Sequence, residues 1–148
     1  MSNRTELGSG AYGKVFAYAK AALKLIPIGK SGDTNLQSFI RELDVLRHSN
    51  SYIVEFFKCD WRYGSVELHM ERMDTDILKY LKNQAFENKD IYAIMEDISH
   101  GLHFLHSHCI AHRDIKPSNI LLKRTNKGLR AKLCDFGLSR KFSNELHR

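Results

Sequence analysis

The sequence predicts an α+β fold in which a β-rich part with one helix precedes a mainly helical part. Two observations carry this prediction. Short strand-forming segments surround a single amphipathic helix in the first part of the chain, and a long amphipathic helix followed by a hairpin fills the second. The junction lies near Met73 to Asp76, and a cleft between the two parts is the natural place for a ligand.

The first part opens with strands. Residues 4–7 (RTEL) can form one strand, and residues 15–26 (VFAYAKAALKLI) can form two more around a tight Ala-Lys turn. An amphipathic helix is expected from a capping residue at position 33 or 34, because apolar residues then recur at helical spacing. These residues are Leu36, Phe39, Ile40, Leu43 and Leu46. Two further strands are expected over residues 53–57 (IVEFF) and 65–70 (SVELHM).

The second part begins with a helix over residues 90–106, predicted from one apolar stripe. The stripe comprises Ile91, Ile94, Met95, Ile98, Leu102 and Leu105. The polar loop HRDIKPSN follows at residues 112–119, and NILL and AKLC form a hairpin around the turn segment TNKG.

Composition restricts the class of protein. The chain has 148 residues with 43% apolar content, as expected of a globular domain. It has no long uncharged apolar run and no signal-peptide pattern, so we expect a cytoplasmic or nuclear protein. The net charge of +6 is spread among acidic residues, which favours a solvated surface over binding of nucleic acid or a membrane. Three widely spaced cysteines without a CxxC pair are typical of reduced thiols.

A glycine-rich segment, GSGAYGKV at residues 8–15, lies between two predicted strands. Its three glycines can let backbone amides approach a phosphate, although such segments are also ordinary turns. A dinucleotide-binding fingerprint requires a helix after the glycines, and here a strand follows. The dinucleotide-binding interpretation therefore fails, and by itself the segment is either an ordinary turn or a phosphate-binding segment of another kind.

Two charged residues occur where apolar ones are expected. Lys24 alternates with Ala22 and Ile26 on one strand face, and Glu42 lies along the apolar stripe of the first helix without a basic neighbour one turn away. Since each buried charge costs several kcal/mol unless it is paired, we predict an ion pair between them. The alternative is that both are independent surface charges.

The end of the last predicted strand carries another carboxylate, Asp135, before Phe136 and Gly137. Together with Asn119 it would offer two oxygen ligands on one side of the cleft. Hard oxygen ligands in small number are what Mg²⁺ prefers in proteins.

Taken in order, GSGAYGKV, the lysine of AALK, the glutamate of RELDVL, HRDIKPSN and DFG resemble the eukaryotic protein kinase family from Leu7 to about Gly137. The resemblance implies a protein-kinase-like fold, with an N-terminal ATP-binding lobe over residues 1–73 and part of a C-terminal lobe over residues 74–148. It implies ATP and Mg²⁺ as the cofactors.

The resemblance also implies roles for single residues. Asp114, Lys116, Lys24 and Glu42 would be catalytic, with Asp114 orienting the substrate hydroxyl and Lys116 neutralising charge on the phosphoryl group. Asn119 and Asp135 would hold Mg²⁺. The cofactor-binding residues would be Leu7, Gly8, Ser9, Gly10, Ala11, Tyr12, Gly13, Lys14, Val15, Ala22, Lys24, Met70, Glu71, Met73, Asp76, Lys116, Asn119, Leu121 and Asp135.

Lys116, two residues after Asp114, is similar to the pattern of serine/threonine kinases. HMERMDTDILKYL resembles the hinge of cyclin-dependent and mitogen-activated kinases, which implies that Met70 is the gatekeeper, that Glu71 to Met73 contact adenine and that Asp76 meets the ribose. Val15, Ala22 and Leu121 would sandwich the adenine ring.

The family pattern is incomplete after the DFG motif, since the sequence ends at Arg148. Two functions follow as alternatives: a kinase that phosphorylates Ser or Thr of a protein substrate, or a truncated, weakly active or inactive module that binds nucleotide or a protein partner. In either case a partner or a missing chain segment is expected to cover the apolar stripe of the helix at residues 90–108.

Overall fold

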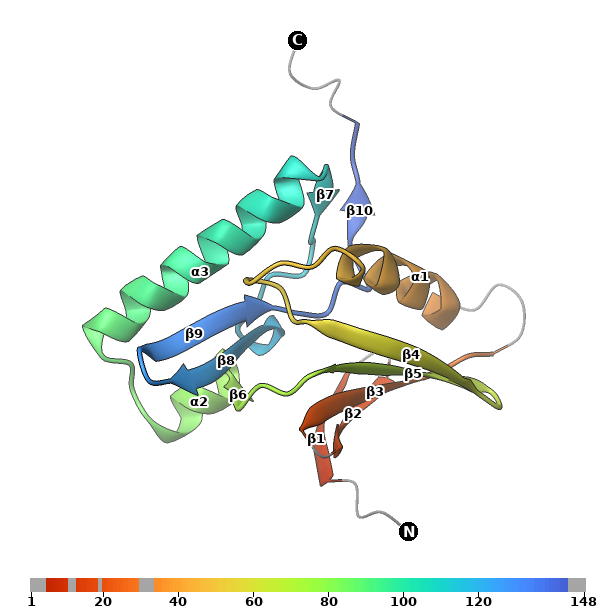
Figure 1. Cartoon of the computed structure of the whole chain (residues 1–148), viewed down its shortest axis with the longest axis horizontal. Coiled ribbons are helices and arrows are strands. Elements are labelled where there is room, and N and C mark those ends of the chain that lie inside the picture. The colour runs from red at the N-terminus through yellow and green to blue at the C-terminus, as the bar shows by residue number, and fades with distance from the viewer. Residues whose placement is uncertain (1–4, 11–12, 19, 30–33, 144–148) are drawn as a thin grey trace.

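The fold joins an antiparallel sheet to a group of helices and short strands, as the computed structural model shows (Figure 1). The structure describes residues 5–10, 13–18, 20–29 and 34–143. The main sheet has the strand order β1-β2-β3-β5-β4. Its strands are β1 (Thr5–Gly10), β2 (Gly13–Tyr18), β3 (Ala21–Pro27), β4 (Phe56–Arg62) and β5 (Ser65–Glu71). The predicted α+β class is confirmed.

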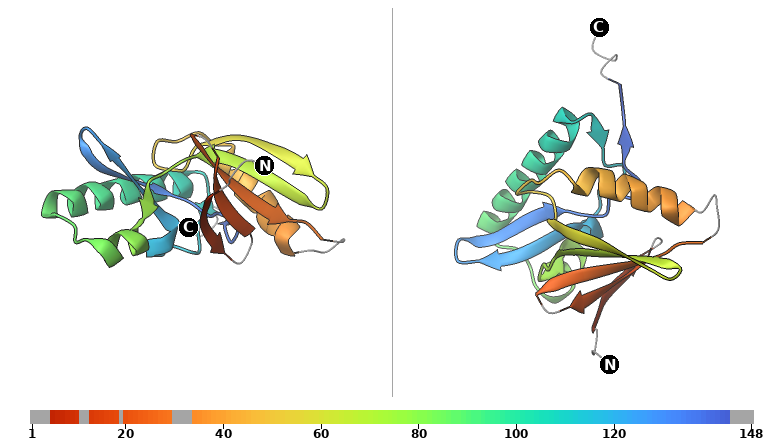
Figure 2. Two further views of the ribbon diagram at one scale, coloured as in Figure 1. Left: turned by 90° about the horizontal axis from the view of Figure 1, so that it is seen from below. Right: turned by 45° about the vertical axis from the view of Figure 1, so that its right-hand side comes forward.

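Helix α1 (Thr34–Leu46) lies across one face of this sheet, as Figures 1 and 2 show. Phe39 and Leu46 are buried among the core residues, as the helical spacing predicted, and Val45, which lies outside the predicted stripe, is buried with them. Ile40 differs, since its side chain is exposed. The predicted capping position 33 lies outside the described residues, and the helix begins at the other candidate, Thr34.

The second part of the chain forms a long helix packed on a hairpin. α3 (Asn88–Ser107) lies along β9 (Gly128–Leu133), which pairs with β8 (Ile120–Thr125). The predicted helix and hairpin are therefore confirmed. The shorter elements are β6 (Thr75–Asp76), α2 (Ile77–Asn83), β7 (Ile110–Ala111), the 3₁₀ helix η1 (Pro117–Asn119) and β10 (Arg140–Lys141).

The apolar stripe of α3 divides between the core and solvent. Ile94 and Leu105 are buried in the core, and Ile98 and Leu102 are half-buried against it. Ile91 and Met95 are exposed. We expected a partner or a further chain segment to cover the whole stripe. This expectation is wrong for the buried residues, because the hairpin already covers them.

The strand predicted over residues 53–57 is misplaced, since β4 begins at Phe56 and continues to Arg62. The apolar residues before it have a different partner: Val54 N–H donates to Leu133 O at 3.0 Å, and Leu133 N–H donates to Tyr52 O at 2.9 Å. Ile53 and Val54 are buried at this junction. They are apolar because they join the main sheet to β9, not because they lie within the sheet.

The cysteines and the helices of the described residues add two findings. Cys59, Cys109 and Cys134 form no disulfide, as their spacing predicted. Among the helices of the described ranges, none has both the length and the apolar character needed to cross a membrane.

Candidate functional site

A buried ion cluster joins β3, α1 and the segment after β9. The ammonium of Lys24 lies 2.8 and 2.6 Å from the two carboxylate oxygens of Glu42 and 3.0 Å from Oδ1 of Asp135. Lys24 and Glu42 are 6% and 1% exposed, so the predicted ion pair is confirmed and the reading of both as surface charges is wrong. The sequence did not predict that Asp135 would share the same ammonium.

In this cluster the ammonium of Lys24 attracts both carboxylates, which repel each other. Burial by itself would lower the pKa of Lys24, but attraction from Glu42 and Asp135 outweighs burial and raises that pKa well above its ordinary value. Burial raises the pKa of the Glu42 carboxyl, and the ammonium of Lys24 opposes that rise. Lys24 is therefore a permanent cation held between two carboxyl groups that approach it from different elements.

The segment at Asp135 has a constrained backbone. Asp135 has φ 62°, a left-handed conformation that is uncommon for residues other than glycine. The ring of Phe136 is fully buried, with its centroid 5.0 Å from that of His112. Burial raises the pKa of the neighbouring Cys134 thiol, which stays protonated at neutral pH and is a weak nucleophile. Packing thus fixes the direction of the Asp135 carboxylate.

His112 holds the polar loop against this segment. Its Nε2 lies 3.0 Å from Cys134 O, and its Nδ1 accepts a hydrogen bond from Asp114 N–H at 3.2 Å. One nitrogen donates and the other accepts, which is the pattern of a neutral imidazole. Burial lowers the pKa of His112 and favours that neutral form. The next residue, Arg113, has φ 69°, so the loop is strained where it turns.

Asp114 lies at the centre of a small hydrogen-bond network. Asn119 Nδ2 donates to its Oδ2 at 2.8 Å and to its backbone oxygen at 2.9 Å, and Lys116 Nζ lies 2.8 Å from Oδ2. The hydrogen bond to Asp114 raises the pKa of Lys116. Cys134 N–H donates to Asn119 O at 3.1 Å, which joins this network to the ion cluster.

The glycine-rich segment forms the adjoining ends of β1 and β2, at the edge of the sheet. Leu7, Gly8, Ser9 and Gly10 belong to β1, while Gly13, Lys14 and Val15 belong to β2. A Cβ at Gly13 would lie 2.3 Å from Leu25 O, so only glycine fits there. Ala11 and Tyr12 lie outside the described residues. The Lys14 side chain is exposed and lies 3.8 Å from Glu6.

Apolar residues predicted to bind a ring lie on the same sheet face as Lys24. Val15 pairs with Lys24, and Ala22 pairs with Met70, in the registers of β2–β3 and β3–β5. Directly paired residues, and residues two apart on a strand, share a face. Leu121 pairs with Asp76 in β6–β8, so it belongs to the second part of the chain.

The predicted hinge residues have definite partners. The Glu71 carboxylate accepts a hydrogen bond from Glu55 N–H and binds Lys132, while Glu71 N–H donates to Glu55 O at 2.9 Å. Met73 is buried. Asp76 is the N-cap of α2, where its Oδ1 accepts a hydrogen bond from Lys79 N–H at 2.8 Å. Asp76 therefore has a structural task in addition to any contact with a ligand.

The sequence did not predict a contact between α2 and the glycine-rich strand. Lys79 Nζ donates to Leu7 O at 2.7 Å and lies 3.2 Å from Asp76 Oδ2, so it joins α2 to the glycine-rich strand. Its spacing three residues after a capping aspartate is the only signal that could have indicated the ion pair. The contact with Leu7 depends on the tertiary fold.

The chain matches the protein kinase domain family over residues 1–147. It is 35% identical to "Cyclin-dependent kinase 4 homolog" of Caenorhabditis elegans, covering 93% of this chain and 38% of that protein. It is 34% identical to "Cell division control protein 2 homolog 3" of Trypanosoma brucei brucei, covering 95% and 47%. It is 32% identical to "Serine/threonine-protein kinase crk1" of Schizosaccharomyces pombe, covering 96% and 44%.

The ion cluster, the polar loop and this match together define a protein kinase fold, and the chain belongs to the protein kinase domain family. It spans less than half the length of these three relatives.

Proposed function

We propose that the chain carries the ATP-binding and phosphoryl-transfer residues of a protein serine/threonine kinase. One observation carries the proposal: the backbone of Cys134, the residue before Asp135, links the ion cluster to the polar loop. Its N–H donates to Asn119 O at 3.1 Å, and its carbonyl oxygen lies 3.0 Å from His112 Nε2. Phosphoryl transfer requires this combination, because its catalysis consists mainly of positioning and of stabilising charge. Residues 1–73 then form the ATP-binding lobe, and residues 74–148 form part of the C-terminal lobe.

The first proposed task is to bind ATP. Glu42 holds the Lys24 ammonium on the sheet face, where it can contact the α and β phosphates. The backbone of residues 8–15 covers the phosphates. Val15, Ala22 and Leu121 pack on the adenine ring, with Met70 behind it. The backbone at Glu71 to Met73 meets the adenine edge, and Asp76 meets the ribose.

Asn119 and Asp135 fit a magnesium ion. Asn119 uses Nδ2 for both hydrogen bonds to Asp114, which leaves Oδ1 as the amide atom that can meet a cation. The Asp135 side chain is 32% exposed and adds a carboxylate oxygen. Both ligands are hard oxygens and few in number, as Mg²⁺ prefers. When bound, Mg²⁺ neutralises phosphate charge during transfer.

The remaining residues would act on the acceptor. The Asp114 carboxylate would accept the hydrogen bond of a Ser or Thr hydroxyl and take its proton as the oxygen attacks the γ-phosphorus. The bond from the γ-phosphorus to the bridging oxygen breaks in the same step, and ADP leaves with that bond's electron pair. Lys116 is half exposed and bonded to Asp114, so its ammonium can turn toward the transferring phosphoryl group. The similarity to a serine/threonine-protein kinase of Schizosaccharomyces pombe supports Ser and Thr as acceptors.

The test measures binding and transfer separately. We expect Mg-ATP to raise the unfolding midpoint of the chain, and Asp135→Asn to abolish most of that rise. We expect phosphate transfer from labelled ATP to a Ser/Thr-rich protein substrate, and a loss of about 10³-fold or more in Asp114→Asn. Asp44→Asn, a surface aspartate paired with Arg47 and Lys141, is the matched control for both assays.

The outcomes separate the two alternatives. Binding without Asp114-dependent transfer would favour a nucleotide-binding module over an active kinase. An unfolding midpoint that does not rise when Mg-ATP is added would overturn the proposal as a whole.

Two further expectations remain proposals. The exposed Ile91, Tyr92 and Met95 on α3 support a partner or a further chain segment that covers this part of the helix. A cytoplasmic or nuclear location stays a prediction.

A further inference from the structure

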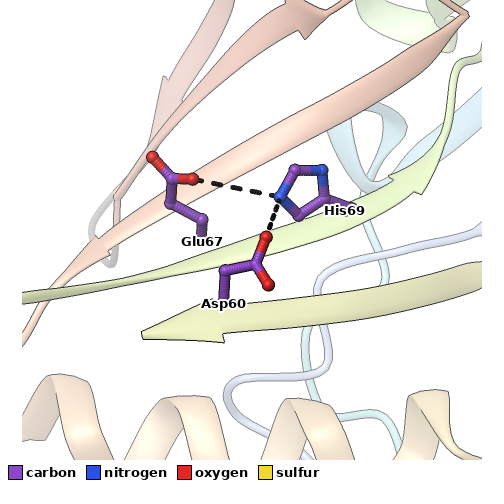
Figure 3. A group of neighbouring side chains, drawn as sticks. All are labelled: Asp60, Glu67 and His69. Atoms are coloured by element: carbon purple, nitrogen blue, oxygen red, sulfur yellow. Dashed lines mark ion pairs between the residues drawn. The ribbon is translucent and has the colours of Figure 1, made fainter. Parts of the chain in front are cut away.

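A second cluster of ligand-type side chains lies away from the ion cluster of Lys24. Asp60 on β4 pairs in register with Glu67 on β5, and His69 follows two residues later on the same strand. Figure 3 shows the three side chains converging on the face of the sheet opposite α1. One ligand atom from each residue lies within 4.8 Å of the other two. The strand register, and not a loop, sets this geometry.

The distances suit a small divalent ion. His69 Nε2 lies 3.1 Å from Asp60 Oδ2 and 3.9 Å from Glu67 Oε2. Ligand atoms around a tetrahedral Zn²⁺ with bonds of about 2.0–2.1 Å are about 3.3–3.5 Å apart. The observed separations bracket this value, so small rotamer changes would complete three of four coordination positions.

The imidazole gives an independent indication. The His69 side chain is 12% exposed, and its Nε2 atom is buried without a hydrogen-bond partner among the described residues. This nitrogen lies 3.1 Å from Asp60 Oδ2 and faces Glu67, but it makes no hydrogen bond of acceptable geometry with either carboxylate. A cation between the three groups would give the nitrogen a ligand bond.

Two basic side chains contact the carboxylate oxygens of this cluster. Lys58 lies 2.6 Å from Asp60 Oδ2, and Arg62 lies 3.4 Å from Glu67 Oε2. Both side chains are more than half exposed, so both can turn into water. A bound divalent ion would neutralise the carboxylates in place of these two side chains.

We propose that Asp60, Glu67 and His69 form a zinc site that links β4 to β5. One nitrogen and two carboxylate oxygens favour Zn²⁺ over Mg²⁺, because Mg²⁺ prefers oxygen ligands alone. The fourth position is left for water. The site stabilises the outer hairpin of the sheet and is independent of the proposed kinase reaction.

The test titrates the 148-residue chain with zinc chloride and follows the heat of binding in the presence of excess Mg²⁺. We expect one site, with Zn²⁺ affinity reduced at least about tenfold in His69→Gln and in Asp60→Asn. His100→Gln is the matched control, since His100 also lies 3.9 Å from a carboxylate, that of Glu96, but has no third ligand. It should leave the affinity unchanged.

Two further measurements do not depend on how well the ligand variants fold. Lys58→Gln removes a competing ammonium and is expected to bind Zn²⁺ more tightly. In the unmodified chain, the imidazole nitrogen signals of His69 should move at substoichiometric Zn²⁺, before those of the other histidines. Zinc binding that survives His69→Gln, a Lys58→Gln affinity that does not rise, or early shifts confined to other histidines would each overturn the proposal.

Discussion

Two carboxylates, Glu42 and Asp97, are almost completely buried, and they are satisfied in different ways. Glu42 on α1 binds the single ammonium of Lys24, which it shares with Asp135. Asp97 on α3 accepts hydrogen bonds from Arg130 Nε at 2.9 Å, from Arg130 Nη2 at 2.6 Å and from Ala131 N–H at 2.8 Å. One carboxylate belongs to the candidate site, and the other fastens α3 to β9.

The partners of these two carboxylates differ in number and in rigidity, as expected if Glu42 belongs to the candidate site and Asp97 to the supporting structure. Asp97 has three donors from adjacent residues of one strand, and the guanidinium fork fixes their geometry. Glu42 depends on one flexible lysine whose other partner, Asp135, belongs to another part of the chain. Removing Lys24 leaves a buried charge with nothing to replace it, whereas the half-exposed Arg130 can be solvated if Asp97 is changed. We therefore expect the two clusters to respond unequally to substitution.

Lys24→Met should have the largest effect. Breaking a buried pair by removing one partner costs about 3–5 kcal/mol, because the remaining charge stays buried and uncompensated. Urea unfolding of the chain measures this loss. The double variant Lys24→Met/Glu42→Met should recover most of the stability, because it removes both buried charges. A double variant no more stable than Lys24→Met would show that the cluster is not the cause.

Asp97→Asn should have a smaller effect, a loss of about 2 kcal/mol in the free energy of unfolding, because hydrogen bonds to charged groups are weakened and Arg130 can be hydrated. Asp44→Asn makes the same chemical change in a half-buried carboxylate whose partners, Arg47 and Lys141, are both more than half exposed, and it should cost less than about 0.5 kcal/mol. Neither variant should alter the rise in midpoint with Mg-ATP. If Mg-ATP no longer raised the unfolding midpoint of Asp97→Asn, Asp97 would have to contribute to the nucleotide site as well as to the packing of α3 on β9.

The sequence predicted the pair at Lys24 and Glu42 because a charge in an apolar pattern requires a partner wherever the chain folds. It did not predict that Arg130 would bind Asp97, since both residues are polar in positions where polar residues are ordinary. The cluster of Asp60, Glu67 and His69 was also missed. Its members become neighbours only through the register of β4 and β5, which the sequence does not state.

Strand boundaries were predicted less well than helices. The helix over residues 90–106 and the hairpin after it follow from clear periodicity and turn residues. The apolar run at residues 53–57 has no such period, and its first residues bond to Leu133 instead of entering the sheet. Local pattern indicates burial there, but only the tertiary fold shows against which element a residue is buried.

His112 is buried in its neutral form, unlike Glu42 and Asp97, and its contribution to the free energy of unfolding should be the smallest of the three. Burial lowers the pKa of His112 in the folded chain, with Asp135 and Asp114 opposing the shift. Between this lowered value and the ordinary value of about 6.5, the unfolded chain binds a proton that the folded chain does not. The free energy of unfolding should therefore fall as pH drops through about 6.5, and level off below the folded pKa.

Thermal unfolding measured from pH 7.5 to pH 5 checks this expectation. His112→Gln should reduce the pH dependence but not abolish it, because the pKa of His48 is also lowered, by burial and by Arg47. A midpoint that rises on acidification would mean that the buried imidazole gains its proton in the folded chain. His112 would then hold the loop at Asp114 as a cation, and the neutral donor and acceptor pattern would be wrong.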